Sequence, residues 1–326
     1  MTRPLRIAIL SHDEAWPEHS YNRTFVQTMV RELDAQFVDV DRAWPPVISD
    51  IAGYGSLDAI VTFIRYRQLV VADPIDWRNF GGIRIQLDHD AYTDAVLAGP
   101  LKGTWARTFR RHQFDHLIVS GLRLVDHFDA QGVPTSWLPK GFDGDAVTNL
   151  GHTRAGVGHY GTLYRSRRAM LRALRRAGTP IPHCVIPYDH LNDHLNDFAG
   201  VVVCSVDARV RWGKVGRALE RKWPGAALEL GMEVEPMIKT FEVAGAGCAP
   251  LLTPSPDLEP LGFSDGETAL VWRDFDELAE LVRDVQHDSE RLTAVGDSAA
   301  DLAHRRHTWK HRATELSAII DRLQRR

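Results

Sequence analysis

The chain has 326 residues, of which 44% are hydrophobic and 25% charged, and its formal net charge at pH 7 is −4. This length exceeds one ordinary hydrophobic core and suits two domains of about 150 residues each. The composition is that of a globular protein, no stretch reaches the run of about 20 apolar residues that a membrane span needs, and the charge argues against a protein coated in phosphate-binding cations.

The start of the chain and its cysteines favour a cytoplasmic protein. Residues 1–6 lead directly into an apolar strand and lack the apolar core of a signal peptide. The three cysteines, Cys184, Cys204 and Cys248, have neither metal-ligand nor redox spacing, and each lies in an apolar run. We therefore expect small buried thiols.

The first half of the chain alternates short apolar runs with longer amphipathic ones. Strands are predicted at Leu5–Ser11, Gln36–Val40, Leu57–Ile64, Gly82–Asp88 and Asp115–Ser120. Helices are predicted at Ser20–Leu33, Thr104–His112 and Leu122–Gln131. Val133–Pro139 is predicted as an edge strand, because its prolines cannot occupy the centre of a sheet. This alternation predicts a doubly wound parallel sheet.

Polar residues follow two of these strands. His12 and Asp13 come after the first, and Asp88, His89 and Asp90 close the fourth. Ligands of such sheets bind where the carboxyl ends of strands open into loops. A histidine, or a carboxylate with a raised pKa, suits a general base near neutral pH. We therefore take Asp13, His89 and Asp90 as candidate catalytic residues.

The second half of the chain repeats this architecture. Lys140–His152 is rich in glycine and polar residues and is predicted to be an interdomain linker. Strands are predicted at Gly156–Thr162, Pro182–Ile186, Gly200–Ser205, Ala226–Leu230, Ala249–Thr253 and Thr268–Trp272. Helices are predicted at Ser166–Arg176, Met237–Ala246, Phe275–Val285, Ser289–Ala303 and Trp309–Gln324. We expect domains at 1–145 and 153–326, with the last helix able to pack back on the first domain.

The helix before the strand Ala249–Thr253 carries charges that could hold a nucleotide. Lys239 and Glu242 share one helix face, because they are three positions apart. A carboxylate can accept both hydroxyls of a ribose, and an ammonium can neutralise a diphosphate. Taken alone, the pattern also fits a surface ion pair on a helix capped by glycine.

A second phosphate candidate is the loop Gly161–Arg165, which opens into a helix and offers backbone N–H groups and a helix dipole. Arg165, Arg167 and Arg168 could add charge there, and we favour Arg165 or Arg168 together with Lys239. The alternative is that these arginines belong to one solvated basic face of the helix.

The segment Lys239–Gly247 resembles the nucleotide-binding helix of GT-B glycosyltransferases: a basic residue, then Phe-Glu or Leu-Glu, then Ala-x-Gly and a buried strand. Further segments agree in order with the CgeB-like (spore maturation protein-like, glycosyl transferases group 1) branch. These are Leu138–Asp143, Val157–Arg168, Leu258–Trp272, Phe275–Leu278 and His307–Arg312. The resemblance covers residues 133–320. Before residue 133 only the architecture, the alternation of strands and helices, resembles that of the family.

This resemblance implies an α/β protein with two Rossmann-like doubly wound domains that face a cleft, the acceptor side first and the donor side second. It implies transfer of a hexosyl or related sugar from a nucleotide sugar, such as a UDP-sugar, to a small-molecule, glycan or protein acceptor, with no cofactor and no metal. It makes Asp13, His89 and Asp90 the base or sugar-orienting groups. The nucleotide-sugar residues that it implies are Gly161, Thr162, Arg165, Arg168, Glu235, Lys239, Thr240 and Glu242.

One departure from the family leaves the sugar end of the site open. Retaining relatives carry two glutamates separated by seven residues, whereas Glu233 and Glu235 precede Glu242 by nine and seven positions. Glu235 is the nearer approximation to a sugar-contacting carboxylate. Asp88 and Asp90 have the spacing of an Asp-x-Asp triplet, which is the reason to test divalent ions.

Three other functions fit the sequence. A nucleotide-sugar epimerase of the same fold would need no acceptor. A DNA-modifying glycosyltransferase would act on modified bases, although the net charge and the lack of aromatic residues among the basic runs weigh against DNA. A non-catalytic binding protein would have kept the fold without the reaction.

Overall fold

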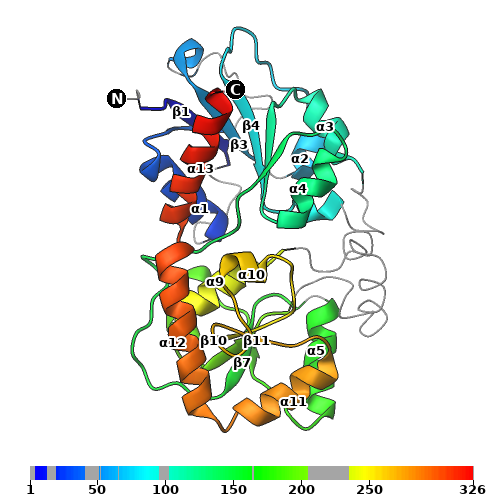
Figure 1. Ribbon diagram of the computed structural model, residues 1–326, viewed down its shortest axis with the longest axis vertical. Helices are drawn as coiled ribbons and strands as arrows, with labels where there is room; N and C mark the ends of the chain where they lie inside the picture. Colours follow the sequence, from blue (N-terminus) through cyan, green and yellow to red (C-terminus); the bar gives the residue numbers. More distant parts are fainter. Residues whose placement is uncertain are drawn as a thin grey trace. The chain divides into compact units, whose positions relative to one another are not determined.

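The computed structural model of the chain describes residues 4–12, 20–40, 51, 53–64, 66–94, 103–163, 165–204 and 235–325. They form two compact units, whose helices and strands are labelled in Figure 1. Unit 1 contains the described residues through Pro139 together with those from Trp309 onward, and unit 2 extends from Lys140 to Thr308. The last helix is therefore part of unit 1.

Unit 1 is built on a parallel sheet of six strands in the order β2-β1-β3-β4-β5-β6. The strands are β1 (Ile7–Ser11), β2 (Gln36–Asp39), β3 (Ala59–Phe63), β4 (Ile83–Asp88), β5 (His116–Val119) and β6 (Thr135–Trp137). β1 and β3 are buried along their whole length, as expected where helices cover both faces of a parallel sheet. β6 lies at the edge, which confirms the position predicted from its flanking prolines.

The helices of unit 1 lie on two sides of this sheet (Figure 1). They are α1 (Tyr21–Glu32), α2 (Tyr66–Val71), α3 (Trp105–Arg111), α4 (Leu122–Asp129) and α13 (Trp309–Gln324). α1 begins after Ser20, whose hydroxyl accepts a hydrogen bond from the backbone N–H of Arg23 at 3.4 Å. α13 packs against α1 and β4, and its Trp309 ring lies 4.9 Å from the ring of Phe25 between centroids.

Unit 2 is built on a second parallel sheet, of five strands in the order β11-β10-β9-β7-β8. The strands are β7 (Val157–Tyr160), β8 (His183–Cys184), β9 (Gly200–Val202), β10 (Ala249–Leu252) and β11 (Leu270–Val271). Each of these strands lies within an apolar run that was predicted as a strand. The strand predicted at Ala226–Leu230 lies outside the described residues.

Helices cover both faces of this second sheet as well (Figure 1). They are α5 (Arg165–Arg176), α6 (Leu191–Leu195), α9 (Ile238–Gly245), α10 (Leu258–Leu261), α11 (Phe275–Val285) and α12 (Ser289–Arg306). α5 packs with α11, whereas α12 packs with α9 and β10. Nowhere in the described part of the chain is a helix both long enough and apolar enough to cross a membrane.

The segment predicted as a linker is packed into unit 2 from its first residue. Phe142 is fully buried, and its backbone N–H donates to the carbonyl of His307 at 3.1 Å. A Cβ atom added at Gly245 would lie 2.2 Å from the Phe142 ring, so the phenyl ring rests directly on the backbone of α9. Glycine at this position is therefore required by close packing.

Candidate functional site

The strand order of unit 2 reverses between β7 and β9. Counted along the chain, the order β8-β7-β9-β10-β11 is that of flavodoxin-like sheets, which bind ligands outside the carboxyl ends of the strands at this reversal. Tyr160 is the last residue of β7, and Gly161 and Thr162 follow it. The predicted phosphate loop thus lies where the topology favours a ligand.

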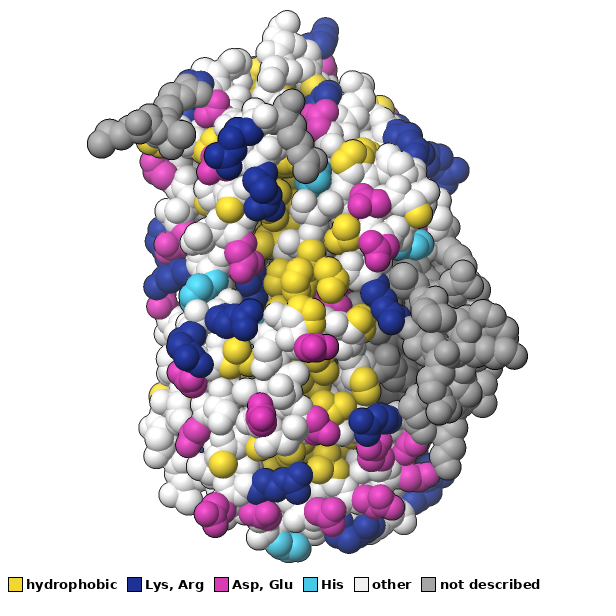
Figure 2. All heavy atoms as spheres, in the orientation of Figure 1, with side chains coloured by type: hydrophobic (Ala, Val, Ile, Leu, Met, Phe, Trp, Pro, Cys, Tyr) yellow, Lys and Arg dark blue, Asp and Glu magenta, His cyan; other side chains and the backbone are white. Residues whose placement is uncertain are grey.

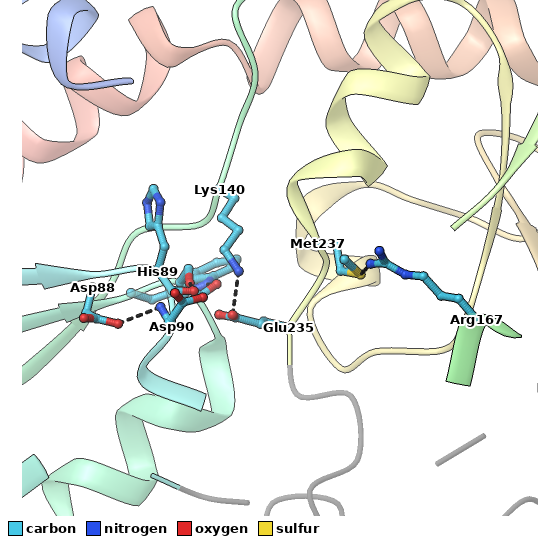
Figure 3. A network of polar contacts seen from close by, with 9 residues as sticks. Asp88, His89, Asp90, Lys140, Arg167, Glu235 and Met237 are labelled. Carbon is cyan, nitrogen blue, oxygen red and sulfur yellow. Dashed lines mark hydrogen bonds and ion pairs between the residues drawn. The ribbon is translucent and has the colours of Figure 1, made fainter. Parts of the chain in front are cut away.

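Arg167 joins the segments that meet at this reversal. It is 2% exposed, and its Nε donates to the carbonyl of Cys204 at 3.0 Å, just beyond β9. Its Nη1 donates to the carbonyl of Thr162 at 2.8 Å. Its Nη2 lies 3.6 Å from the sulfur of Met237 at the start of α9 (Figure 3). A guanidinium is always charged, so the reversal carries a permanent positive charge.

The sequence favoured two other arginines of the same helix, Arg165 and Arg168. The side chain of Arg168 is exposed, and that of Arg165 is outside the described residues. Arg167 shares a helix face with Met170 and Leu174, both fully buried, at spacings of three and seven positions. This apolar periodicity was the signal in the sequence that distinguishes Arg167 from its neighbours.

Lys239 places a second cation at the reversal. It lies on the first turn of α9, and its Nζ donates to the carbonyl of Tyr160 at 2.5 Å. The same nitrogen lies 3.8 Å from the centroid of the Tyr160 ring, within range of a cation–π interaction. Burial first, and then the positive charge of Arg167, lowers the pKa of Lys239 to about 7.

Gly161 lies directly against the ammonium of Lys239. Its φ of +96° lies in the left-handed region, which favours glycine, and a Cβ atom there would lie 2.0 Å from Nζ of Lys239. Its carbonyl is 2.8 Å from Nε2 of His183. The loop therefore combines a conformational and a steric requirement for glycine.

Glu242 is a buried carboxyl group on the same helix as Lys239. It is 3% exposed, and the hydroxyl of Tyr160 donates to its Oε2 at 2.7 Å. Burial raises the pKa of Glu242, while the hydrogen bond from Tyr160 and the charge of Lys239 oppose the rise. Within the described ranges no hydrogen bond reaches Oε1 of Glu242, which leaves an acceptor for a ligand hydroxyl.

Tyr188 is a polar group near Glu242 that the sequence did not single out. It begins the turn Tyr188–His190 after β8. Burial raises its pKa, and the negative charges of Glu242 and Asp143 add to the rise. Its buried hydroxyl has no hydrogen-bond partner among the residues that the structure describes. A buried hydroxyl without a partner is uncommon, and a bound ligand would satisfy it.

The remaining predicted donor residues lie beside this group. Thr240 is buried in α9, whereas Thr162 is exposed after β7. Glu235 precedes α9, is 5% exposed, and its Oε1 accepts from Nζ of Lys140 at 2.6 Å (Figure 3). This carboxylate is therefore already paired with a cation inside unit 2.

The predicted catalytic residues belong to unit 1. Asp13 lies outside the described residues. The ring of His89 is 5% exposed and lies 4.8 Å from that of Phe25 and 6.2 Å from that of Trp309, between centroids. Asp90 is exposed, and its backbone N–H donates to Oδ1 of Asp88 at 2.6 Å (Figure 3). Of the pair after β4, Asp90 is the accessible one.

The site of unit 2 can bind a phosphorylated nucleoside by its charges and hydroxyls. Lys239 and Arg167 are cations of the kind that neutralise a diphosphate, and Glu242 is an acceptor of the kind that binds ribose hydroxyls. In the described part of the chain, no three His, Cys, Asp or Glu side chains are arranged to hold a metal ion.

Comparisons with known proteins show which proteins this chain is similar to. Residues 165–318 match the family model described as glycosyl transferase-like. Sucrose-phosphate synthase (tll1590) from Thermosynechococcus elongatus has a similar structure, with a TM-score of 0.67 and 11% identity over 98% of this chain and 99% of that one. A comparison with curated protein sequences gave no match.

Two further structures extend the likeness. Anabaena Alr3699/HepE in complex with UDP-glucose gives a TM-score of 0.64 at 11% identity, over 98% of this chain and 100% of that one. The OtsA apo structure gives 0.59 at 11% identity, over 97% and 99% of the two chains. The chain therefore has the GT-B fold, and its residues 165–318 are similar to the glycosyl transferase-like family.

Proposed function

We propose that this chain, which has the GT-B fold and resembles the glycosyl transferase-like family over residues 165–318, transfers a sugar from a UDP-sugar to an acceptor without a metal ion. Within the GT-B proteins we assign it to the CgeB-like branch, on the ordered motifs between residues 133 and 320. Its three cysteines are free, which suits the reducing cytoplasm, where we expect it to act.

The observation that carries this proposal is the group of charges at the β7–β9 reversal. Lys239, Arg167 and Glu242 converge there on Tyr160 and the loop that follows it. In the proposed complex Lys239 and Arg167 neutralise the diphosphate as the bond to the sugar breaks, because the leaving group gains negative charge. Glu242 binds the ribose, with Gly161, Thr162, Thr240 and the arginines of α5 lining the site.

The acceptor half of the reaction is proposed for unit 1. A base there would remove the proton of the acceptor hydroxyl, and Asp13, His89 and Asp90 remain its candidates. Acidic and basic side chains are interspersed over the face shown in Figure 2 and are not gathered there into one basic patch. We propose an acceptor that is a small molecule, a glycan or a protein.

Binding of UDP, UDP-glucose and UDP-N-acetylglucosamine, measured by isothermal titration calorimetry, tests the donor. We expect saturable binding of UDP and of at least one UDP-sugar, with Glu242→Gln weakening binding by about tenfold through the loss of a charged acceptor. If neither UDP nor any UDP-sugar binds, the proposal is wrong.

Release of UDP from a bound sugar nucleotide tests the reaction and the need for a metal. We expect UDP release that increases with added acceptor candidates and is unchanged by excess EDTA. Loss of release in EDTA, with recovery on adding Mg²⁺ or Mn²⁺, would contradict the metal-independent part. Conversion of the sugar to an epimer without an acceptor, whether it stays bound to UDP or is released, would identify an epimerase instead.

A further inference from the structure

Lys140 and Glu235 form a buried ion pair in unit 2. Nζ of Lys140 lies 2.6 Å from Oε1 of Glu235, and their side chains are 9% and 5% exposed. The two residues are 95 positions apart in the chain. Removing two charges from water carries a desolvation cost that their attraction often only balances, so a buried pair is weak evidence for a stabilising role. A positional role is the alternative that the surroundings support.

The pair lies at the start of the helix that carries the donor-site charges. Glu235 is followed by Pro236, which has a fixed φ, and by Met237, which precedes α9 without a side-chain cap. Lys239 is on the first turn of this helix. The position of Lys239 therefore depends on what holds the residues before it, and Lys140 holds Glu235.

The segment that contains Lys140 contacts α9 at its other end too. Phe142 lies two residues after Lys140, and its ring packs on Gly245, the last residue of α9. The backbone of Phe142 pairs in turn with that of Thr308. Residues 140–142 thus contact the segment just before α9 through the charge of Lys140 and the last residue of α9 through the ring of Phe142.

We propose that Lys140 is a positioning residue of the donor site, which acts through Glu235 to fix the start of α9 and with it Lys239. The inference rests on the proposed function, because it takes Lys239 as a diphosphate ligand. It also assigns the carboxylate of Glu235 to the ammonium of Lys140 and not to the donor sugar.

The test is a double-mutant cycle on UDP binding, with Lys140→Met, Glu235→Gln and the two combined. Each single variant should weaken UDP binding about tenfold or more, because a displaced diphosphate ligand loses its geometry. If Lys140 acts only through Glu235, the combined variant binds UDP no more weakly than Glu235→Gln alone. Lys140→Arg should keep UDP affinity within about threefold, because the cation is retained.

Two outcomes would overturn the inference. If the fold-changes in Kd for UDP of the two single variants multiply in the combined variant, Lys140 contacts the nucleotide by itself. Lowered melting temperatures with an unchanged Kd for UDP, measured well below melting, would mean that the pair is only structural. If Lys140→Met does not fold, the combined variant and Lys140→Arg still decide the matter, since neither leaves Glu235 as an unpaired buried charge.

A control with the same shortest separation of 2.6 Å is the more exposed ion pair of Arg84 and Asp115 in unit 1, whose side chains are 26% and 39% exposed. Arg84→Met should lower the melting temperature without changing the Kd for UDP. The unaltered chain separates the two proposals. If it does not bind UDP, both the proposed function and this inference are wrong, whereas binding that the Lys140 and Glu235 variants leave unchanged refutes this inference alone.

Discussion

At the scale of single residues, the most sensitive group in the site is the ammonium of Lys239. Burial and the nearby charge of Arg167 lower its pKa to about 7, so that near neutral pH the free protein holds it partly neutral. A bound diphosphate favours the protonated form. In the free protein the positive charge of Lys239 is therefore present below about pH 7 and is lost as the pH rises through that value.

The first prediction follows from this titration. The Kd for UDP should rise by up to about tenfold for each pH unit above 7, because binding must then take up a proton. Calorimetric titrations between pH 6 and 9 measure the slope. Lys239→Arg should remove it, since arginine stays charged throughout this range. An equal slope in Lys239→Arg would assign the titration to another group.

A second residue-scale prediction concerns Tyr188. Its buried hydroxyl has no partner among the described residues, so Tyr188→Phe should leave the free energy of unfolding unchanged or slightly raised. If a bound nucleotide satisfies that hydroxyl, the same variant should weaken UDP binding by about fivefold to tenfold. Chemical denaturation and calorimetry on the same preparation measure both quantities. A loss of stability with normal UDP affinity would show that the hydroxyl serves the fold.

At the scale of elements, the glycine loop after β7 offers a matched pair of substitutions. Gly161 and Gly178 both have a positive φ, +96° and +76°, but only at Gly161 would a Cβ atom meet another group. Alanine at either position should cost about 1–2 kcal/mol of stability from the left-handed backbone. Only Gly161→Ala should also displace Lys239 and weaken UDP binding. Equal UDP affinity in the two variants would separate the loop from the site.

The boundaries of the helices show which elements local sequence patterns can predict. α11 and α13 begin and end at the predicted residues, and α1 starts after the Ser20 cap, because apolar spacing and capping act within a few residues of one another. The short helices α2, α6 and α10 were not predicted. They have four to six residues each, too few for a helical period to stand out.

At the scale of the whole molecule, the chain returns to unit 1 in its last helix. Trp309 is 1% exposed and packs edge-on against Phe25. Trp309→Ala should lower the free energy of unfolding of unit 1 by about 3–5 kcal/mol, through lost burial and the cavity left behind. UDP binding should be unchanged, because its proposed ligands are all in unit 2. Calorimetric unfolding with and without UDP tests this, and a weakened UDP affinity would mean that the site depends on unit 1.

The sequence by itself determined the order of the elements, the parallel character of both sheets and the segment that holds Lys239 and Glu242. These follow from apolar periods, glycine positions and motif order, all of which lie within short stretches of the chain. Only the tertiary structure decided the partners of Arg167, because the fold brings its guanidinium to the carbonyls of Cys204 and Thr162. It also decided the partners of the two carboxylates, Tyr160 for Glu242 and Lys140 for Glu235. These partners are 82 and 95 positions away in the chain. Such contacts form only when distant segments come together in the fold, so local sequence patterns do not predict them.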